Sequence, residues 1–145
     1  MKIRKATLKD VIPIDGLNKE FFHEEGRNWK ELVSSKDSEM FVLELNKAIV
    51  GFTGLEYRSW NNTAQVIDIF LHPDYRNKGY GTSLVKFLIK YLKNKRYRSL
   101  IVEAPSLNPV LSLYLKNGFR ICGFNDRYYS NKGGEIAIFL SYDFK

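Results

Sequence analysis

The pattern of apolar and polar positions divides this chain into short strands and amphipathic helices. Short apolar runs, bounded by turn residues and rich in β-branched side chains, predict strands. These runs cover 3–6, 40–45, 48–55, 66–71, 99–104, 119–124 and 135–140. The second and third runs flank Asn46-Lys47, which predicts a hairpin with a tight turn.

Helical periodicity is clearest over 84–92, where apolar residues follow the 0, 3, 4, 7, 8 spacing of one helix face and Lys86 and Lys90 lie opposite. Further helices are predicted from about residue 8 to 26, where Thr7 and Asp10 form a capping box, at 28–33, and after the Asn108-Pro109 pair, with Gly118 as the stop. A helix joins the strands at 66–71 and 99–104, which are therefore expected to run parallel.

A glycine loop, Arg76-Asn77-Lys78-Gly79-Tyr80-Gly81, connects the strand at 66–71 to the helix. The first N–H groups of a helix are unpaired and the helix dipole adds partial positive charge, so this junction suits a phosphate or pyrophosphate. Gly79 and Gly81 allow close approach of the backbone, and Arg76 and Lys78 add charge. The loop therefore predicts a polyphosphate ligand.

The identity of this polyphosphate follows partly by elimination. The stretch lacks the Gly-x-x-x-x-Gly-Lys of a P-loop, and Leu84 stands where a dinucleotide fingerprint needs its third glycine. It resembles the Arg-x-x-Gly-x-Gly loop of the GNAT superfamily of acetyl-CoA dependent N-acetyltransferases, approached through 71–75. A second block, Leu113-Tyr114-Leu115-Lys116-Asn117-Gly118-Phe119, is similar to that family's Leu-Tyr-x-Lys-x-Gly-Phe signature.

The resemblance covers nearly the whole chain and implies one N-acetyltransferase domain over residues 1–145, of α/β (α+β) class. The implied domain has a mixed, mainly antiparallel sheet of six to seven strands, flanked by about four helices. The implied reaction is direct attack of a primary amine on acetyl-CoA in a ternary complex, without a covalent intermediate. The cofactor-binding residues that the resemblance implies are Ile69, Phe70 and Leu71 for pantetheine, Arg76, Asn77, Lys78, Gly79, Tyr80, Gly81 and Thr82 for the pyrophosphate, and Asn108.

One tyrosine and three carboxylates are the catalytic candidates. Tyr114 aligns with the family's general acid, with a core aromatic as the alternative. Asp68 is a lone carboxylate in an apolar strand, so it either meets a partner or faces a cavity. Alternation places it on the face of Phe70, where it would act as the base or anchor a cationic amine, with a structural hydrogen bond as the alternative. Glu56 is the second carboxylate candidate and Glu103 the third.

Some positions depart from the family's pattern. Asn77 replaces the usual glycine after the loop arginine, and Tyr80 the usual aliphatic residue. Asn108 lies six residues before Tyr114, whereas the family's pantetheine-binding asparagine usually lies seven before, at the place of Leu107. Asn108 is therefore expected first as a helix cap and second as a cofactor contact. Aromatic residues of the early helices are expected either in the acceptor wall or in the core; these are Phe21, Phe22 and Trp29.

Composition changes this picture little. With 44% hydrophobic residues among 145, the chain can bury a real core. Lysine and arginine total 23 against 16 acidic residues, but the charge is spread and only 93–98 is dense, so nucleic acid is the less favoured partner. The single cysteine, Cys122, excludes an internal disulfide and is expected to be buried. His23 and His72 have structural explanations, so no metal is expected.

No apolar run approaches the length of a membrane span and the N-terminus leads directly into structure, so a cytoplasmic protein without a membrane partner is expected; a homodimer is left open. The segment 123–139 also resembles streptothricin acetyltransferases, which favours a small cationic amine as acceptor. Two alternatives stay open. One is a protein acetyltransferase acting on N-terminal or lysine amines, and the other is a non-catalytic module that senses acetyl-CoA or docks on nucleic acid.

Overall fold

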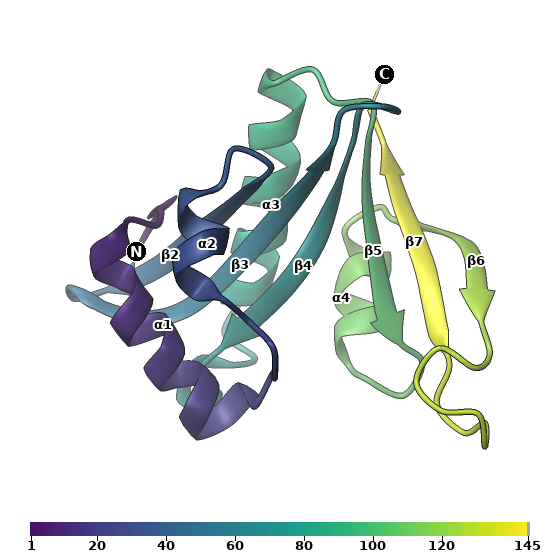
Figure 1. Ribbon diagram of the computed structural model, residues 1–145, viewed down its shortest axis with the longest axis horizontal. Helices are drawn as coiled ribbons and strands as arrows, with labels where there is room; N and C mark the ends of the chain where they lie inside the picture. Colours follow the sequence, from purple (N-terminus) through teal and green to yellow (C-terminus); the bar gives the residue numbers. More distant parts are fainter. Residues whose placement is uncertain (145) are drawn as a thin grey trace. The chain divides into compact units, whose positions relative to one another are not determined.

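The computed structural model describes residues 1–144 (Figure 1). Contacts between residues divide the chain into two compact units. The first unit consists of Met1–Tyr57 and Ile67–Leu84, and the second of Arg58–Val66 and the chain from Val85 onward. Strand β4 (Thr63–Leu71) begins in the second unit and ends in the first, whereas helix α3 (Tyr80–Asn94) begins in the first and ends in the second.

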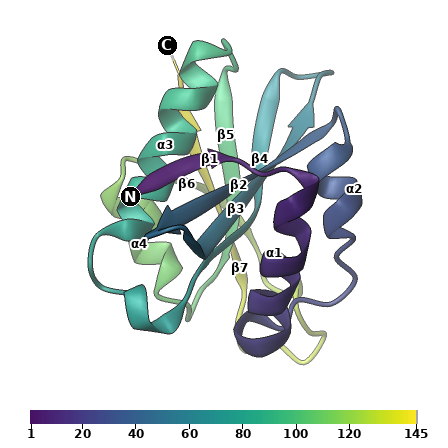
Figure 2. The ribbon, with the colours of Figure 1, turned by 90° about the vertical axis from the view of Figure 1, so that its left-hand side faces the viewer.

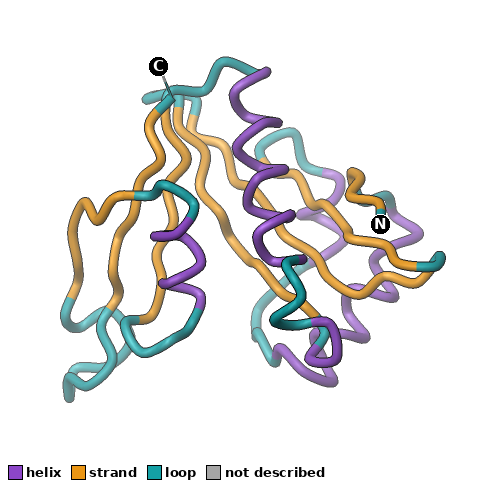
Figure 3. Tube along the Cα trace, turned by 180° about the vertical axis from the view of Figure 1, so that it is seen from behind, coloured by secondary structure: helices purple, strands orange, loops and turns teal. Residues whose placement is uncertain are grey.

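The strands form a seven-stranded sheet in the order β1-β2-β3-β4-β5-β7-β6. The other strands are β1 (Lys2–Lys5), β2 (Ser38–Leu45), β3 (Ala48–Arg58), β5 (Ser99–Pro105), β6 (Arg120–Asn125) and β7 (Ala137–Asp143). The other α-helices are α1 (Val11–Leu17), α2 (Trp29–Ser34) and α4 (Val110–Lys116), and Figure 3 distinguishes helix from strand by colour. Strand β4 pairs parallel with β5, while β1–β2, β2–β3, β5–β7 and β6–β7 are antiparallel. The expected α+β class with a mixed, mainly antiparallel sheet is confirmed.

In the first unit, β2 and β3 form the predicted hairpin. Asn46 and Lys47 have φ values of 50° and 67°, the left-handed conformation that a two-residue turn between twisted strands requires. Helices α1 and α2 lie against one face of this hairpin (Figure 2). The core on that side consists of Ala6, Ile14, Trp29, Val33, Met40, Val42, Phe52 and Phe70. Leu43, Val50 and Leu84 form a second cluster, on the side of the start of α3.

The N-terminal elements are fixed by charged hydrogen bonds. The N–H of Thr7 donates to the carboxylate of Asp10 at 2.7 Å, which confirms the predicted capping box. Arg4 donates two further hydrogen bonds to the same carboxylate, at 2.7 and 2.9 Å. Two hydrogen bonds from one guanidinium set the orientation as well as the distance, so β1 is tied to the start of the first helix.

The first helix ends earlier than the sequence predicts. After α1, a π-helical turn, η2 (Asn18–Phe22), leads to His23 in the left-handed region with φ of 59°. The amide of Asn18 donates to the carbonyl of Glu24 at 3.0 Å and accepts the N–H of Glu24 at 2.9 Å. These two bonds replace the helical ones, so the expected helix to about residue 26 was wrong in its last turn. Helix α2 is confirmed, with the side chain of Asn28 accepting from the N–H of Glu31 at 3.1 Å.

In the second unit, β5 lies beside β7, β7 beside β6, and α4 precedes β6 (Figure 1). Cys122, on β6, is exposed, so the expectation of a buried thiol was wrong. Strand β6 is the last in the strand order, and five of its six residues are exposed. An apolar stretch predicts a strand, but it does not tell whether that strand lies at the edge of the sheet.

Asp143 joins the three strands of the second unit. It accepts hydrogen bonds from Ser99 of β5 at 2.9 Å, from Ser141 of β7 at 2.7 Å and from Arg120 of β6 at 2.7 Å. The Arg120 bond and then the two serine bonds lower the pKa of the Asp143 carboxyl from 3.8 to about 2. The folded structure therefore stabilises the ionised form of the Asp143 carboxyl.

We expect Asp143→Asn to lower the melting temperature at neutral pH by an amount that shrinks in acid. A carboxyl whose pKa is lowered by folding stabilises the fold above its unfolded pKa, and this contribution is lost as pH falls toward the folded value of about 2. Thermal melts between pH 7 and pH 2 measure the difference. The control is Asp126→Asn, since that exposed carboxylate pairs only with its neighbour Arg127 at 3.2 Å. A difference that stays constant with pH would contradict the assignment.

Candidate active site

Arg76 ties the end of β4 to the loop that follows it, within the first unit. Its Nε donates to the carbonyl of Leu71 at 2.8 Å, and its guanidinium lies 5.6 Å from the centre of the Phe70 ring. Between them the one-turn helix η3 (Pro73–Tyr75) reverses the chain, capped by the imidazole of His72. The Arg76 side chain therefore links the end of β4 to the first residue of the glycine loop.

The glycine loop contains two left-handed residues. Asn77 has φ of 60° and Gly79 has φ of 91°. Glycine adopts this region freely and asparagine more readily than most residues, which explains how Asn77 serves where the family pattern usually has glycine. The first N–H of α3 to find a helical acceptor is that of Ser83, which donates to the carbonyl of Gly79 at 3.1 Å. The N–H groups of residues 80–82 precede it and have no acceptor within the helix.

Aromatic residues anchor the loop to the core. Tyr75 and Tyr80 lie edge to face, 6.4 Å apart, and both pack on the cluster around Leu84. The ammonium group of Lys78 lies 5.9 Å from the centre of the Tyr75 ring. Tyr80, which stands where the family pattern has an aliphatic residue, thus keeps the packing role of that position.

Gly51 of β3 allows a close approach to the end of β4. A Cβ at this position would lie 2.8 Å from the carbonyl oxygen of Phe70 and 3.1 Å from the side chain of Leu71. Just past the end of β4, the N–H of His72 donates to the carbonyl of Val50 at 2.8 Å. The backbone of residues 70–72 is therefore held on its β3 side before any ligand binds.

Asp68 meets a partner rather than an open cavity. Nε and Nη2 of Arg27 donate to its two carboxylate oxygens at 2.8 and 2.9 Å. The side chain of Asp68 is 2% exposed and that of Arg27 is 30% exposed. As the alternation predicts, Asp68 lies on the buried face of β4 with Phe70. Its main-chain carbonyl accepts the hydroxyl of Thr53 at 2.7 Å, which fixes the strand locally.

The charges of this pair influence each other. Burial raises the pKa of the Asp68 carboxyl, and the hydrogen bonds from Arg27 oppose that rise. The hydrogen bond to Asp68 raises the pKa of Arg27, so the guanidinium stays charged. The carboxylate of Glu24 also lies 3.6 Å from Nη2 of Arg27. The buried carboxylate of Asp68 is therefore paired with a guanidinium that remains partly exposed to solvent.

Sequence analysis missed Arg27. It lies 41 residues before Asp68, in the irregular segment between η2 and α2. The sequence offered one indication of an ion pair here, because Arg27 follows the acidic residues Glu24 and Glu25 closely. That signal cannot be matched to a carboxylate on a distant strand until the fold brings the two together.

The early aromatic residues divide between the two expected environments. Trp29 is 4% exposed and packs edge to face on Phe52 at 5.3 Å, which places it in the core. Phe21 and Phe22 are half-buried and lie 6.4 and 5.3 Å from the Phe70 ring. They thus cover the strand that carries Asp68 from the side of η2.

The second unit holds two of the predicted site residues. Tyr114 on α4 is 2% exposed, its hydroxyl oxygen is buried, and its ring lies edge to face with Phe119 at 5.1 Å. The side-chain oxygen of Asn108 accepts the N–H of Val110, the first residue of α4, at 2.9 Å, while Pro109 between them is the N-cap residue of that helix. Leu107, at the family's usual asparagine position, is 80% exposed.

The remaining carboxylate candidates have different surroundings. Glu56 lies on β3 in the first unit, opposite Ser38, and is exposed. Glu103 lies on β5 in the second unit, where its hydrogen bond raises the pKa of Tyr128 to about 12. Asp68 is thus the one buried acid among these three.

No group of three or more histidine, cysteine, aspartate or glutamate residues within 1–144 could hold a metal ion. His23 is exposed just after η2, and His72 accepts the N–H of Asp74 at 3.1 Å. Over the same described range, no helix is long and apolar enough to cross a membrane.

Comparison with known proteins adds to this geometry. Streptothricin acetyltransferase of Streptomyces lavendulae is 28% identical over 109 residues, which make up 72% of this chain and 58% of that protein. The chain thus spans little more than half of that relative. A Bacillus anthracis str. Ames protein, assigned as a streptothricin acetyltransferase and solved in complex with acetyl coenzyme A, is 27% identical with a TM-score of 0.75, covering 86% of this chain and 72% of that one.

The fold comparison extends further along the chain. The ribosomal-protein-S18-alanine N-acetyltransferase of Escherichia coli has a TM-score of 0.84 at 23% identity, covering 98% of this chain and 92% of that one. The profile of the Acetyltransferase (GNAT) family matches residues 8–119, which include the first helix, the glycine loop and α4. This match covers well over half of the chain, and the chain therefore belongs to the GNAT acetyltransferase family.

Proposed function

We propose that this enzyme transfers an acetyl group from acetyl-CoA to a primary amine by direct attack, with both substrates bound at once. The observation that carries the proposal is the backbone of the glycine loop, where Asn77 and Gly79 are left-handed and three N–H groups precede the first internal bond of α3. The family assignment and the acetyl coenzyme A complex of the B. anthracis relative support the same cofactor.

The loop fits a diphosphate. The N–H groups of residues 80–82 lie at the start of α3, where the helix dipole also favours an anion. Nothing lies within 4 Å of the position that a Cβ on Gly79 would take, so a phosphate oxygen can approach the backbone there. Arg76 is bound to Leu71, and the exposed side chain of Lys78 would supply the full charge.

Residues 69–71 would hold the pantetheine arm. The pairing of β4 with β5 comprises Thr63–Gln65, so this segment lies beyond the last β4 residue of that ladder. The amides of a pantetheine arm can complete such a strand edge by main-chain hydrogen bonds. Acetyl-CoA supplies the acetyl group as an activated thioester, and a backbone N–H near Phe70 or Leu71 would stabilise the negative charge on its oxygen.

The proposed acceptor is a small cationic amine. Similarity to streptothricin acetyltransferase supports this class. So does Asp68, because its buried carboxylate already binds one cation, Arg27, which solvent can reach. Asp68 would attract the ammonium group of the acceptor or accept its proton through water, and burial raises the pKa of its carboxyl. Glu56 is the second candidate for this role.

Tyr114 is the proposed general acid. The departing thiolate must gain a proton, and a tyrosine hydroxyl can supply it. The buried hydroxyl oxygen of Tyr114 is consistent with a water-poor site for that transfer. Because no covalent intermediate is needed, one acid, one base and the backbone donors of β4 are sufficient for the reaction.

We expect acetyl-CoA to bind with a Kd in the micromolar range, about −8 kcal/mol, and Gly79→Ala to weaken that binding about tenfold. Alanine is strained at a φ of 91° and would shift the loop amides. Gly134→Ala is a matched control, since Gly134 has φ of 92° and equally open surroundings. Isothermal titration calorimetry with acetyl-CoA measures the effect, and a nicotinamide dinucleotide serves as the control ligand.

Equal weakening by both alanine variants would show a general loss of stability instead of a loop effect. Absence of acetyl-CoA binding would refute the proposed cofactor. Thiol release with small polyamines, compared with peptides bearing one free amine, then tests the acceptor. Release with peptides alone would replace the small-amine proposal by protein acetylation.

Tyr114→Phe is expected to lower kcat by about 10²- to 10⁴-fold while leaving acetyl-CoA affinity unchanged, because only proton transfer is lost. Steady-state thiol release and calorimetry on the same preparation give both values. The melting temperature serves as the control for folding. Full turnover in this variant would assign Tyr114 to the core alone.

Arg27→Ala is expected to reduce the free energy of unfolding by about 3 kcal/mol at pH 7, because it leaves a buried carboxylate unpaired. Burial raises the folded pKa of that carboxyl above its unfolded value, so the loss should shrink as pH falls and Asp68 takes up a proton. Urea unfolding at pH 7 and pH 5 tests this. The double variant Arg27→Ala/Asp68→Asn should regain part of the loss, and a failure to do so would contradict the pairing.

A further inference from the structure

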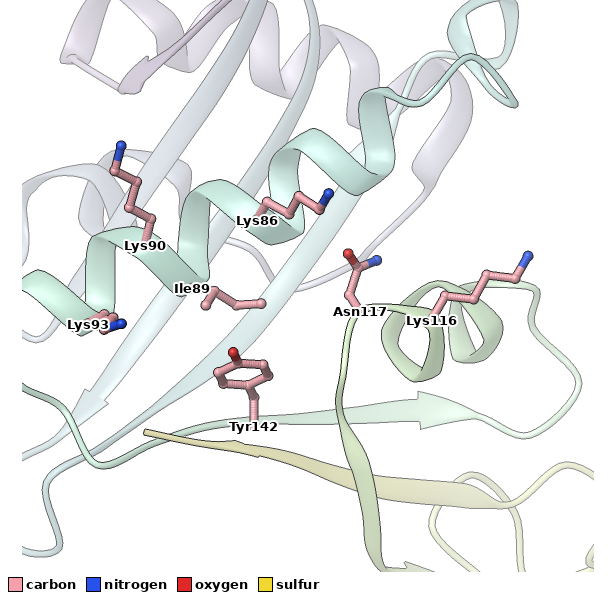
Figure 4. A pocket seen from close by; sticks show the side chains of 7 residues that line it. All are labelled: Lys86, Ile89, Lys90, Lys93, Lys116, Asn117 and Tyr142. Atoms are coloured by element: carbon pink, nitrogen blue, oxygen red, sulfur yellow. The ribbon is translucent and has the colours of Figure 1, made fainter. Parts of the chain in front are cut away.

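The second unit contains an open pocket of about 440 Å³ that the proposed reaction does not use (Figure 4). Helix α3 forms one wall and the end of α4 the other, with the Tyr142 ring of β7 between them. The lining residues are Lys86, Ile89, Lys90, Lys93, Lys116, Asn117 and Tyr142. Four of these seven side chains are therefore ammonium groups.

The lysines carry charge that the protein does not neutralise. Lys86, Lys90 and Lys93 follow the i, i+4, i+7 spacing of one helix face, and Lys116 stands on the opposite wall. Among residues 1–144, none of these four ammonium groups lies within 4 Å of a carboxylate. Like charges at this spacing repel each other. Binding of an anion would relieve that repulsion.

Tyr142 provides a firmly held aromatic surface in the same pocket. Its ring packs against Phe119 at 5.6 Å and Phe144 at 5.3 Å. Gly118, with φ of 91°, lets the chain pass close by, since a Cβ there would lie 3.2 Å from the Tyr142 ring. In Figure 4 the hydroxyl of Tyr142 is directed toward α3, beside Ile89. The pocket thus offers apolar contact as well as positive charge.

We infer that this pocket binds a nucleoside polyphosphate as a second ligand, separate from the acetyl donor. The phosphates would lie among the lysine ammonium groups, and the base would stack against Tyr142 and Ile89. A volume of about 440 Å³ is in the range of small-molecule sites. Along α3 the pocket extends from Lys86, four residues or about 6 Å beyond Thr82, to Lys93, eleven residues or about 16 Å beyond it, so its far end lies well away from the diphosphate loop.

Two other anionic partners explain fewer of these features. An acidic peptide would use the lysines but gives no role to the fixed ring of Tyr142. A nucleic-acid strand needs charge that continues along a surface, whereas these four lysines share one pocket with apolar lining. A compact ligand with several phosphates and one aromatic base uses both kinds of contact.

The test is a calorimetric titration of ATP into protein that is already saturated with coenzyme A, so that the glycine loop is occupied. We expect saturable ATP binding, weakened at least tenfold by Lys93→Gln/Lys116→Gln. The matched control is Lys9→Gln/Lys36→Gln, which removes the same charge from exposed positions of the first unit and should change the Kd less than twofold. Tyr142→Leu should weaken ATP but not inorganic triphosphate.

Several results would overturn the inference. One is the absence of saturable ATP binding, and another is equal loss in the two charge variants. If coenzyme A affinity falls in parallel with ATP affinity, the lysines bind the coenzyme's own phosphates. Saturable binding of single-stranded RNA alone would replace the nucleotide by a nucleic acid. ATP binding with the expected lysine dependence, in a protein that fails to bind coenzyme A, would sustain this inference and refute the proposed acetyl transfer.

Discussion

The hydrogen bond from Arg76 to the carbonyl of Leu71 is the interaction on which the cofactor half of the candidate site depends. It satisfies the last acceptor of β4 and fixes where the chain turns toward α3. With the arginine so used, the proposed anion site would consist of backbone N–H groups, whose positions follow from the left-handed Asn77 and Gly79. A site made of backbone tolerates changes in the side chains of its loop, and this explains why Tyr80 can stand at an aliphatic position.

The ion pair between Arg27 and Asp68, at the proposed acceptor position, depends on side-chain charge instead of backbone groups. A carboxylate that is 2% exposed is costly unless a cation binds it, and Arg27 does so with two hydrogen bonds. The guanidinium comes from an irregular segment and keeps part of its surface in solvent. A protonated amine could therefore take its place without exposing Asp68 to water. The pair stabilises the buried carboxylate, and the proposed cationic acceptor would use the position that Arg27 now occupies.

Local patterns predicted much of this structure from sequence. The apolar spacing from Leu84 to Leu92 gave α3, alternation gave the face of Asp68, and Asn46-Lys47 gave the hairpin. Features that depend on distant contacts were not accessible. The first helix ends where the side-chain amide of Asn18 forms hydrogen bonds with the backbone of Glu24. Arg27 forms its hydrogen bonds with Asp68, a residue 41 positions later in the sequence. The burial of Cys122 was misjudged for the same kind of reason, because the edge position of β6 depends on how the strands are ordered.

Positive charge is spread along the whole sequence, but on helix α3 it is concentrated at defined positions where an anion could bind. Its first turn attracts an anion through unpaired N–H groups and the dipole, an effect that fades within one turn. Its later turns attract anions only through side chains, and there Lys86, Lys90 and Lys93 share one face. Because backbone and side-chain charge act on different turns, one helix can serve two anions without competition. Of the surplus of seven positive charges, the lysines that line this pocket therefore account for a part.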